Sequence, residues 1–458
     1  MIAITGCDDD DPPAQPACTL TCTAPAVLLA DCTCFTPNTD PCAGVTCPDG
    51  FTCENGACVD DGSVKNVTKA GFISADETWT KNNIYFLSGK VVVEDGVTLT
   101  IEAGTVVKGK GGVGSLASAL VIAQGGKLNA NGTAAEPIIM TSEDDDVLPG
   151  QVKGSNLDET TNGLWGGLLV LGKAPISVDG DVEFAQIEGI PADDAFGRYG
   201  GTDEMDNSGS MTYLSVRHGG ALIGEGNEIN GITLGGVGAG TVIENVEVVA
   251  NKDDGIEWFG GTVNVKNAVI WAADDDGVDI DQAYKGTIDN FVVICNGTDH
   301  ALEIDGPEGA LAGSFTLTNG SIYGDDQELG DMRDRATGTL SNIWFTGFTK
   351  NPNELRACTQ SEVDDAENTS CNALTDMVKN GEGDFSLSSG TDATYAAGDI
   401  TFMGFELTVP EGTSVTAAEV FKNFTTADQN AVGMVTTPTI GADLSVFDWT
   451  YAKADGKF

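Results

Sequence analysis

The chain has 458 residues, of which 70 are Asp or Glu and 22 are Lys or Arg, giving a formal net charge of −48. This excess of acid excludes nucleic acid and anionic membrane surfaces as partners and leaves cations or cationic partners. Solubility in salty water is a second explanation, because salt screens the repulsion between like charges. The 60 glycines, together with recurring aliphatic stretches, argue against a disordered chain.

Residues 1–16 contain a candidate lipid anchor. The segment ITGC, which ends at Cys7, resembles the lipobox of bacterial lipoproteins, and the acidic run Asp8–Asp11 resembles the surface-export signal of Bacteroidota lipoproteins. The resemblance implies an acylated Cys7 and an outer-membrane lipoprotein at the cell surface. Only six residues precede Cys7, fewer than a signal peptide needs, so we expect the true start to lie upstream. An ordinary cysteine before a solvated acidic tail is the alternative.

Cysteines crowd residues 17–62, which predicts a small disulfide-rich module in an oxidising compartment. Zinc is the alternative, but neither quartet of cysteines has the paired CxxC spacing that zinc sites favour. The second quartet lies in PCAGVTCPDGFTCENGACV, which resembles the EGF-like stalk repeats of bacterial surface proteins. The spacing does not determine which cysteines pair. The predicted disulfide cysteines of this module are Cys18, Cys22, Cys32, Cys34, Cys42, Cys47, Cys53 and Cys58.

Repeated strand-like segments begin after residue 63. The stretches Val97–Gly109 and Ala119–Gly132 match at a step of 21 residues, with Ile101 aligned on Ile122. Each combines a β-branched strand with a glycine turn, where a coil can change direction without a Cβ clash. The step predicts that the two stretches occupy the same position in successive coils.

Three acidic copies then follow one another: NKDDGIEWFGG, AADDDGVDIDQA and NGTDHALEIDG. They align on Asp253, Asp275 and Asp299, at steps of 22 and 24 residues. A period in this range, carried by strand-like alternation, indicates a parallel β-solenoid with one coil per period. Apolar residues such as Ile256 and Trp258 are expected to point inward, because successive strand residues face opposite sides.

The segment from VRHGG at Val216 to DQAYKG at Gly286 resembles a family of bacterial surface proteins regarded as right-handed parallel β-helices. The similarity extends over Gly89–Gly306, and FDWTYAKADGKF at Phe447–Phe458 resembles the family's terminal coil. The resemblance implies a fold and a surface location but no activity. We therefore predict an all-β chain, a right-handed parallel β-helix preceded by the disulfide-rich module. The helix is expected over 63–345, and a loop closed by Cys358 and Cys371, the last coils and a cap over 346–458.

The acidic residues of the three copies are expected to form a grid on the outer face. Stacked coils place members of one column about 4.8 Å apart, so the carboxylates repel unless protons, cations or donors intervene. Ca²⁺, with roughly 6–8 oxygen ligands, fits a cluster drawn from two coils, and screening by diffuse cations is the alternative. The candidate metal ligands are Asp253, Glu257, Asp275, Asp279, Asp281, Asp299, Glu303 and Asp305.

Some of these polar residues have ordinary structural explanations. Asp253, Asp275 and Asp299 stand at strand entries, where aspartate often accepts hydrogen bonds from turn N–H groups. His300 replaces the second aspartate of the DD pair and is interpreted as a hydrogen-bonding turn residue. Arg217 is expected to pair with an acidic residue.

A groove for sugars, with Trp258 or Tyr284 as an aromatic platform, is a further hypothesis for the acidic face. Enzymes also use this fold, and polygalacturonases carry the motifs NTD, DD, GHG and RxK in that order along the chain. This sequence does not follow that order, because His218 precedes the aspartate pairs and no RxK follows them. The sequence therefore favours a non-catalytic surface protein for adhesion, envelope structure or capture of a glycan or protein. A polysaccharide-active enzyme is the alternative, and the oligomeric state stays open.

Overall fold

The chain divides into two units, Met1–Ser63 and Val64–Phe458. In the computed structural model, the described residues are 27–28, 34–35, 41–42, 44–47, 51–61, 64–188, 190–191, 194–222, 228–324, 328–332, 336–347, 355–356, 400–409, 412, 416–420 and 431–458. No helix among them is long and apolar enough to cross a membrane.

The first unit contains two antiparallel strand pairs, β1 (Val27–Leu28) with β2 (Cys34–Phe35) and β3 (Phe51–Glu54) with β4 (Ala57–Asp60). Two disulfides, Cys42–Cys53 and Cys47–Cys58, cross-link the second pair and its flanks. Disulfides, and not zinc, therefore account for the second cysteine quartet. The other cysteines with predicted roles lie outside the residues whose side chains the structure describes. They are Cys7, Cys18, Cys22, Cys32, Cys34, Cys358 and Cys371.

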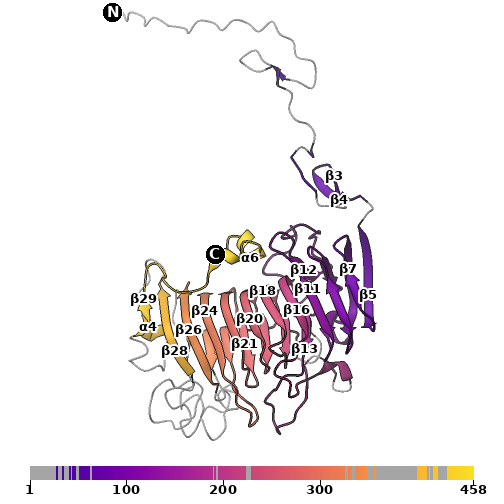
Figure 1. Ribbon diagram of the computed structural model, residues 1–458. Coiled ribbons are helices and arrows are strands. Elements are labelled where there is room, and N and C mark those ends of the chain that lie inside the picture. The colour runs from indigo at the N-terminus through magenta and orange to yellow at the C-terminus, as the bar shows by residue number, and fades with distance from the viewer. Residues whose placement is uncertain are drawn as a thin grey trace, which may run out of the picture. The chain divides into compact units, whose positions relative to one another are not determined.

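The second unit is the predicted parallel β-helix, formed by one 23-stranded sheet that winds through successive coils (Figure 1). Its strands stack in three rows. The first row contains β10 (Ala119–Ile122), β13 (Leu168–Leu171), β17 (Ile232–Gly235), β19 (Ile256–Phe259), β21 (Val278–Asp281), β23 (His300–Ile304), β25 (Glu328–Met332) and β27 (Leu355–Arg356). The second row begins with β6 (Glu77–Trp79), β8 (Thr98–Ile101) and β11 (Lys127–Asn131), and the third includes β9 (Val106–Gly109) and β12 (Ile138–Ser142).

Later coils use one long strand for the second and third rows together. These strands are β16 (Gly209–Arg217), β18 (Val242–Asn251), β20 (Asn264–Ala273), β22 (Thr287–Ile294), β24 (Phe315–Tyr323), β26 (Gly338–Thr346) and β28 (Ile400–Thr408). At the opening of the helix, β5 (Lys65–Ile73) and β7 (Asn83–Val93) span the third and first rows, and β29 (Gly433–Met434) pairs with β28 at the other end.

Most of the long strands bend at an asparagine with positive φ, as at Asn245, Asn267 and Asn290, whereas β16 bends at Tyr213 and β28 at Gly404. Asparagine tolerates this left-handed conformation better than most residues. The side chains also form a ladder, since Asn267 Nδ2 donates to Asn245 Oδ1 at 2.9 Å and Asn290 Nδ2 to Asn267 Oδ1 at 2.7 Å. The column of asparagines therefore both bends the strands and links neighbouring coils by side-chain hydrogen bonds.

The strand register confirms the alignment of the three acidic copies but not the 21-residue step. Ile256 pairs with Val278, and Val278 with Leu302, so β19, β21 and β23 are successive first-row strands. Ile101, by contrast, pairs with Ala130 in the second row, while Ile122 lies in the first row. The alignment of Ile101 with Ile122 is wrong because the early coils have unequal lengths.

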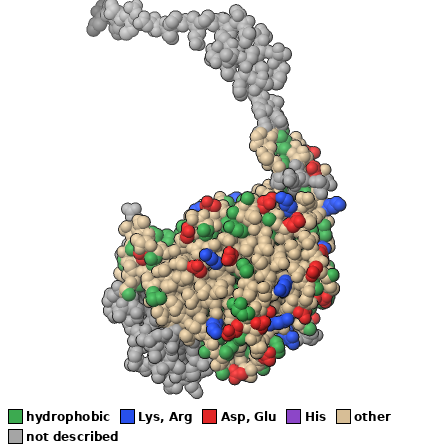
Figure 2. Space-filling view, viewed as in Figure 1, with side chains coloured by type: hydrophobic (Ala, Val, Ile, Leu, Met, Phe, Trp, Pro, Cys, Tyr) green, Lys and Arg blue, Asp and Glu red, His purple; other side chains and the backbone are tan. Residues whose placement is uncertain are grey.

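The interior of the helix is apolar, as the strand alternation predicts. Ile256, Trp258, Val278, Ile280 and Leu302 all belong to one continuous buried core. Each such side chain contributes roughly 1.5–3 kcal/mol on burial. The face shown in Figure 2 carries acidic, basic and apolar side chains interspersed.

The segment between β13 and β16 covers the outer face of the first row near its start. It contains the antiparallel pair β14 (Ala185–Gln186) and β15 (Arg198–Tyr199), with η2 (Ala195–Gly197) between them. Ile187, Ile190 and Tyr199 pack on the outward side chains Val121 and Leu169. A short helix, η1 (Gly114–Leu116), precedes β10.

The C-terminal residues 440–458 form a strap along the flank of the helix and not the terminal coil that the family resemblance implies. They contain η3 (Leu444–Val446) and α6 (Tyr451–Ala454) (Figure 1), whereas α4 (Ala417–Val420) lies in the segment before β29. The strap contacts strands far back along the chain: Ala442 with Ser321, Asp443 with Asn290, Trp449 with Tyr213, Tyr451 with Trp271, and Ala452 with Glu247.

Candidate cation-binding site

One outward column of the first row begins apolar and ends acidic. In register along the row, its members are Val92, Val121, Leu169, Thr233, Glu257, Asp279 and Glu303. The predicted column of Glu257, Asp279 and Glu303 is therefore confirmed. Neighbouring strands lie about 4.8 Å apart, so these carboxylates are held close together by the backbone ladder.

The column lies on the outer face as expected, but its centre is buried. Glu257 is only 5% exposed and Asp279 only 8%, although both point away from the interior of the helix. Asp253 is half-buried, while Asp275 and Asp299 at the strand entries are exposed. The acidic residues of the predicted grid therefore form a partly buried cluster with an open side.

Two groups of three carboxylates converge within the cluster. One oxygen from each of Asp253, Asp254 and Asp275 lies within 4.8 Å of the other two, and the same holds for Asp254, Glu257 and Asp279. Asp254 belongs to both groups, although only its neighbour Asp253 is among the ligands predicted from the sequence. The two groups bring together four of the eight predicted metal ligands. The predicted ligands Asp281, Asp299 and Asp305 belong to neither group, and Glu303 joins a third.

Burial and mutual repulsion disfavour the charged forms of these carboxylates. Burial raises the pKa of Asp254, Glu257 and Asp279 well above the ordinary range, and neighbouring carboxylates raise it further. Burial, followed by the same kind of repulsion, raises the pKa of Asp253 to about 7. Within the described part of the chain, the charges that act most strongly on these four groups all belong to other carboxylates. Near neutral pH the cluster therefore needs protons or a bound cation.

A family model described as a pectate-lyase-like β-helix domain matches residues 71–437, which is most of the chain. The chain belongs to this family. No curated protein and no solved structure matches it. Membership in the β-helix family is compatible with a polysaccharide-active enzyme and with a non-catalytic protein, so the choice depends on the residues of the site.

A third group in the β-helix domain joins Asp276, His300 and Glu303, whose ligand atoms also lie within 4.8 Å of one another. Asp254 Oδ1 accepts a hydrogen bond from the Asp276 N–H at 3.0 Å, and Asp276 Oδ1 accepts one from the His300 N–H at 2.8 Å. His300 Nδ1 lies 2.9 Å from the same oxygen. Burial acts to raise the pKa of Asp276, but the hydrogen bonds and charge of His300 outweigh it and lower that pKa.

These contacts show which aspartate of each DD pair bonds the backbone of the neighbouring coil. In the ladder just described, the second aspartate of each DD pair bonds the N–H of the next coil, and His300 continues the column as a hydrogen-bonding residue. The sequence predicts the turn-bonding role for the first aspartate, such as Asp253. The first aspartates Asp253 and Asp275 instead contribute oxygens to a candidate cation site.

Trp258 and Tyr284 do not form an aromatic platform in the β-helix domain. Trp258 is 0% exposed and Tyr284 is 1% exposed, and both belong to the interior core. Tyr284 Oη donates to the carbonyl of Val263 at 2.6 Å, so its polar end is also satisfied inside the coil. The platform prediction is therefore wrong. Strand alternation places the Trp258 ring on the inward face of β19, and Tyr284, in the turn after β21, packs in the same core.

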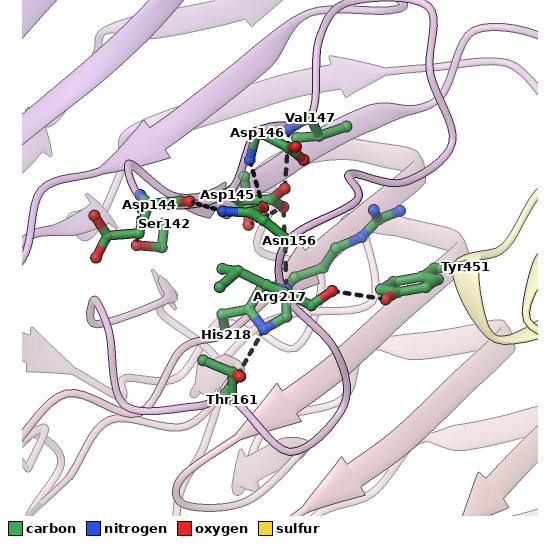
Figure 3. A network of polar contacts seen from close by, with 12 residues as sticks. Ser142, Asp144, Asp145, Asp146, Val147, Asn156, Thr161, Arg217, His218 and Tyr451 are labelled. Carbon is green, nitrogen blue, oxygen red and sulfur yellow. Dashed lines mark hydrogen bonds and ion pairs between the residues drawn. The ribbon is translucent and has the colours of Figure 1, made fainter.

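Arg217 and His218 contact acidic residues that lie outside the acidic cluster. Arg217 Nη2 lies 3.5 Å from Glu247 Oε2, and both side chains are buried, so the expected pairing of Arg217 with an acid is confirmed. His218 Nδ1 lies 2.6 Å from the carbonyl oxygen of Thr161, and its Nε2 lies 4.0 Å from Asp145 Oδ2 (Figure 3). Arg217 thus links β16 to β18, and His218 links the end of β16 to the loop of residues 143–162, which follows β12.

Proposed function

We propose that this protein is an exported, non-catalytic β-helix protein of the cell surface that binds a divalent cation, with calcium preferred, in its acidic cluster. The supporting observation is the convergence of Asp253, Asp254, Glu257, Asp275 and Asp279, whose strongest electrostatic neighbours are further carboxylates. Removing charges from water is unfavourable unless opposite charge compensates. Calcium accepts a flexible shell of carboxylate and carbonyl oxygens, which suits a cluster spread over two coils.

The proposed location depends on the N-terminal unit. The disulfides Cys42–Cys53 and Cys47–Cys58 fit an oxidising compartment. On that basis the 17–62 module is an EGF-like stalk, and Cys7 carries the lipid that anchors the protein to the outer membrane. The cation site then serves adhesion, envelope structure or capture of a surface glycan or protein.

Calcium is expected to raise the thermal stability of the full-length protein. The folded state holds the carboxylates together, whereas the unfolded chain does not, so stability increases with the logarithm of free calcium above Kd. For one site the gain is about 2.7 kcal/mol at a hundredfold excess over Kd. Magnesium should substitute poorly because it demands a tighter octahedral shell. The measurement is the unfolding midpoint in chelator, calcium, magnesium and sodium at equal ionic strength.

Two variants complete this test. Asp254→Asn combined with Asp279→Asn removes carboxylates from the site and should abolish the calcium-specific gain. Glu244→Gln, at an exposed position of β18, removes one charge elsewhere and should leave the gain unchanged. Coincident calcium and sodium curves for the wild-type protein would show that the acidic residues are merely screened.

A polysaccharide-active enzyme is the second candidate, favoured by one observation. Glu257 and Asp279 have raised pKa values and lie in register with Glu303, which shares a group with the Asp276–His300 pair. A protonated carboxyl beside an ionised one is an arrangement that can perform acid–base chemistry. We expect no turnover when pectins, alginates and sulfated glycans are screened for new reducing ends or unsaturated products. Turnover that Asp279→Asn abolishes and Glu244→Gln preserves would establish the enzyme instead.

A further inference from the structure

Asn230 is buried beside the acidic cluster and has one unsatisfied end. It precedes β17, one coil before Glu257, and is 1% exposed. Its Nδ2 donates to Glu257 Oε2, and the same nitrogen lies 3.4 Å from Thr233 Oγ1. Within the described part of the chain, its Oδ1 is a buried acceptor with no hydrogen-bond partner.

Turning the amide over does not solve this problem. The oxygen would then face Glu257, which is an acceptor when ionised, and in either protonation state of Glu257 the NH₂ group would take the unpartnered position. Buried polar groups are nearly always paired, so an orphaned oxygen beside a cluster of carboxylates indicates a missing partner. Because Nδ2 and Oδ1 belong to one amide, the orphaned oxygen lies within a few ångströms of the carboxylate that Nδ2 contacts.

We propose that Asn230 Oδ1 is a ligand of the divalent cation held by Asp254, Glu257 and Asp279. This inference rests on the proposed cation site and adds a specific ligand to it. Side-chain amide oxygens are ordinary calcium ligands, and an ion about 2.3–2.6 Å from both Oδ1 and Glu257 would partner the orphaned atom. The amide adds an oxygen without further negative charge, while its NH₂ group keeps Glu257 oriented.

Two substitutions separate a ligand from a simple hydrogen-bond donor. Asn230→Leu is close in shape but removes both polar ends, whereas Asn230→Asp keeps an oxygen and removes the donor. For a ligand, Asn230→Leu weakens calcium binding at least about tenfold, the loss seen even for groups that only support a ligand. Asn230→Asp then binds calcium at least as tightly as the wild type, but is less stable in chelator because its carboxylate faces Glu257.

The experiment is a calorimetric titration of the full-length proteins with calcium, accompanied by melting curves in chelator to verify folding. Asn264→Leu, at an exposed asparagine of β20, serves as the matched control and should retain wild-type affinity. If Asn230→Leu does not fold, Asn230→Asp decides the question alone. Calcium binding weakened in Asn230→Asp, or unchanged in Asn230→Leu, overturns the ligand role while leaving the cation site intact. A wild-type protein that binds no calcium overturns both.

Discussion

In the absence of calcium, the protein is expected to lose stability as the pH rises from about 4 to 8. The effect originates in Asp253, Asp254, Glu257 and Asp279, whose pKa values are all raised in the folded state. In the unfolded chain these carboxyls ionise near pH 4. Between the two pKa values the folded state binds more protons, so raising the pH favours unfolding.

The sign and size of this effect can be stated for one group. The pKa of Asp253 rises from 3.8 to about 7. Its protonated form stabilises the fold fully below pH 4, and that contribution is lost as the pH rises through 7. The loss is on the order of 4 kcal/mol for an independent group, and coupling among the carboxyls spreads it over a wider range. Asp276, with its lowered pKa, acts in the opposite direction and stabilises the fold above its unfolded pKa.

Unfolding midpoints measured in chelator at pH 5 and pH 8 test this expectation. The midpoint should be lower at pH 8, and saturating calcium should reduce the difference because the ion replaces the protons. Asp254→Asn combined with Asp279→Asn should flatten the pH dependence in chelator, whereas Glu244→Gln should not. A midpoint that rises steadily from pH 5 to pH 8 in chelator would contradict the raised pKa values.

The sequence predicts the register of the site because the acidic copies retain strand alternation. Steps of 22 and 24 residues still place Glu257, Asp279 and Glu303 in one column, since the length differences fall in turns. In the early coils the alignment does not predict the register, because the turns and loops vary more in length. Ile101 and Ile122 therefore lie in different rows. Periodicity is reliable only where the insertions between strands are short.

Burial of the site could not be predicted from the repeats alone. Whether Glu257 is solvated depends on residues outside the copies, such as Asn230, which donates to it from the preceding coil. The orphaned Asn230 oxygen has no sequence signature, because NEING reads as an ordinary polar turn. The position of the strap could not be predicted either, because its contact with Glu247 joins residues 205 positions apart in the sequence. Such long-range contacts require the three-dimensional structure.

Replacement of Arg217 by methionine is expected to destabilise the protein by about 3–5 kcal/mol, the cost of leaving a buried charge without its partner. Arg217 is 1% exposed and Glu247 is 0% exposed. Ser215 bridges them, accepting from Arg217 Nε at 2.7 Å and donating to Glu247 Oε2 at 2.6 Å. Without the guanidinium, Glu247 keeps only neutral hydrogen bonds in a buried position.

The same substitution should loosen the C-terminal strap. The Ala452 N–H donates to Glu247 Oε1 at 2.9 Å, and the Arg217 guanidinium lies 5.0 Å from the centre of the Tyr451 ring (Figure 3). Both contacts hold α6 against β16 and β18. Limited proteolysis should therefore cleave the strap of Arg217→Met earlier than that of the wild-type protein.

A double variant and a surface variant provide the controls. Arg217→Met combined with Glu247→Gln removes both charges and should recover part of the lost stability, because no buried charge remains unpaired. Lys252→Met breaks the Lys252–Asp274 pair, whose side chains are 48% and 40% exposed, and should cost less than about 1 kcal/mol. Thermal unfolding midpoints and strap cleavage rates are compared for all four proteins. Equal effects of Arg217→Met and Lys252→Met would show that the buried pair does not fasten the strap.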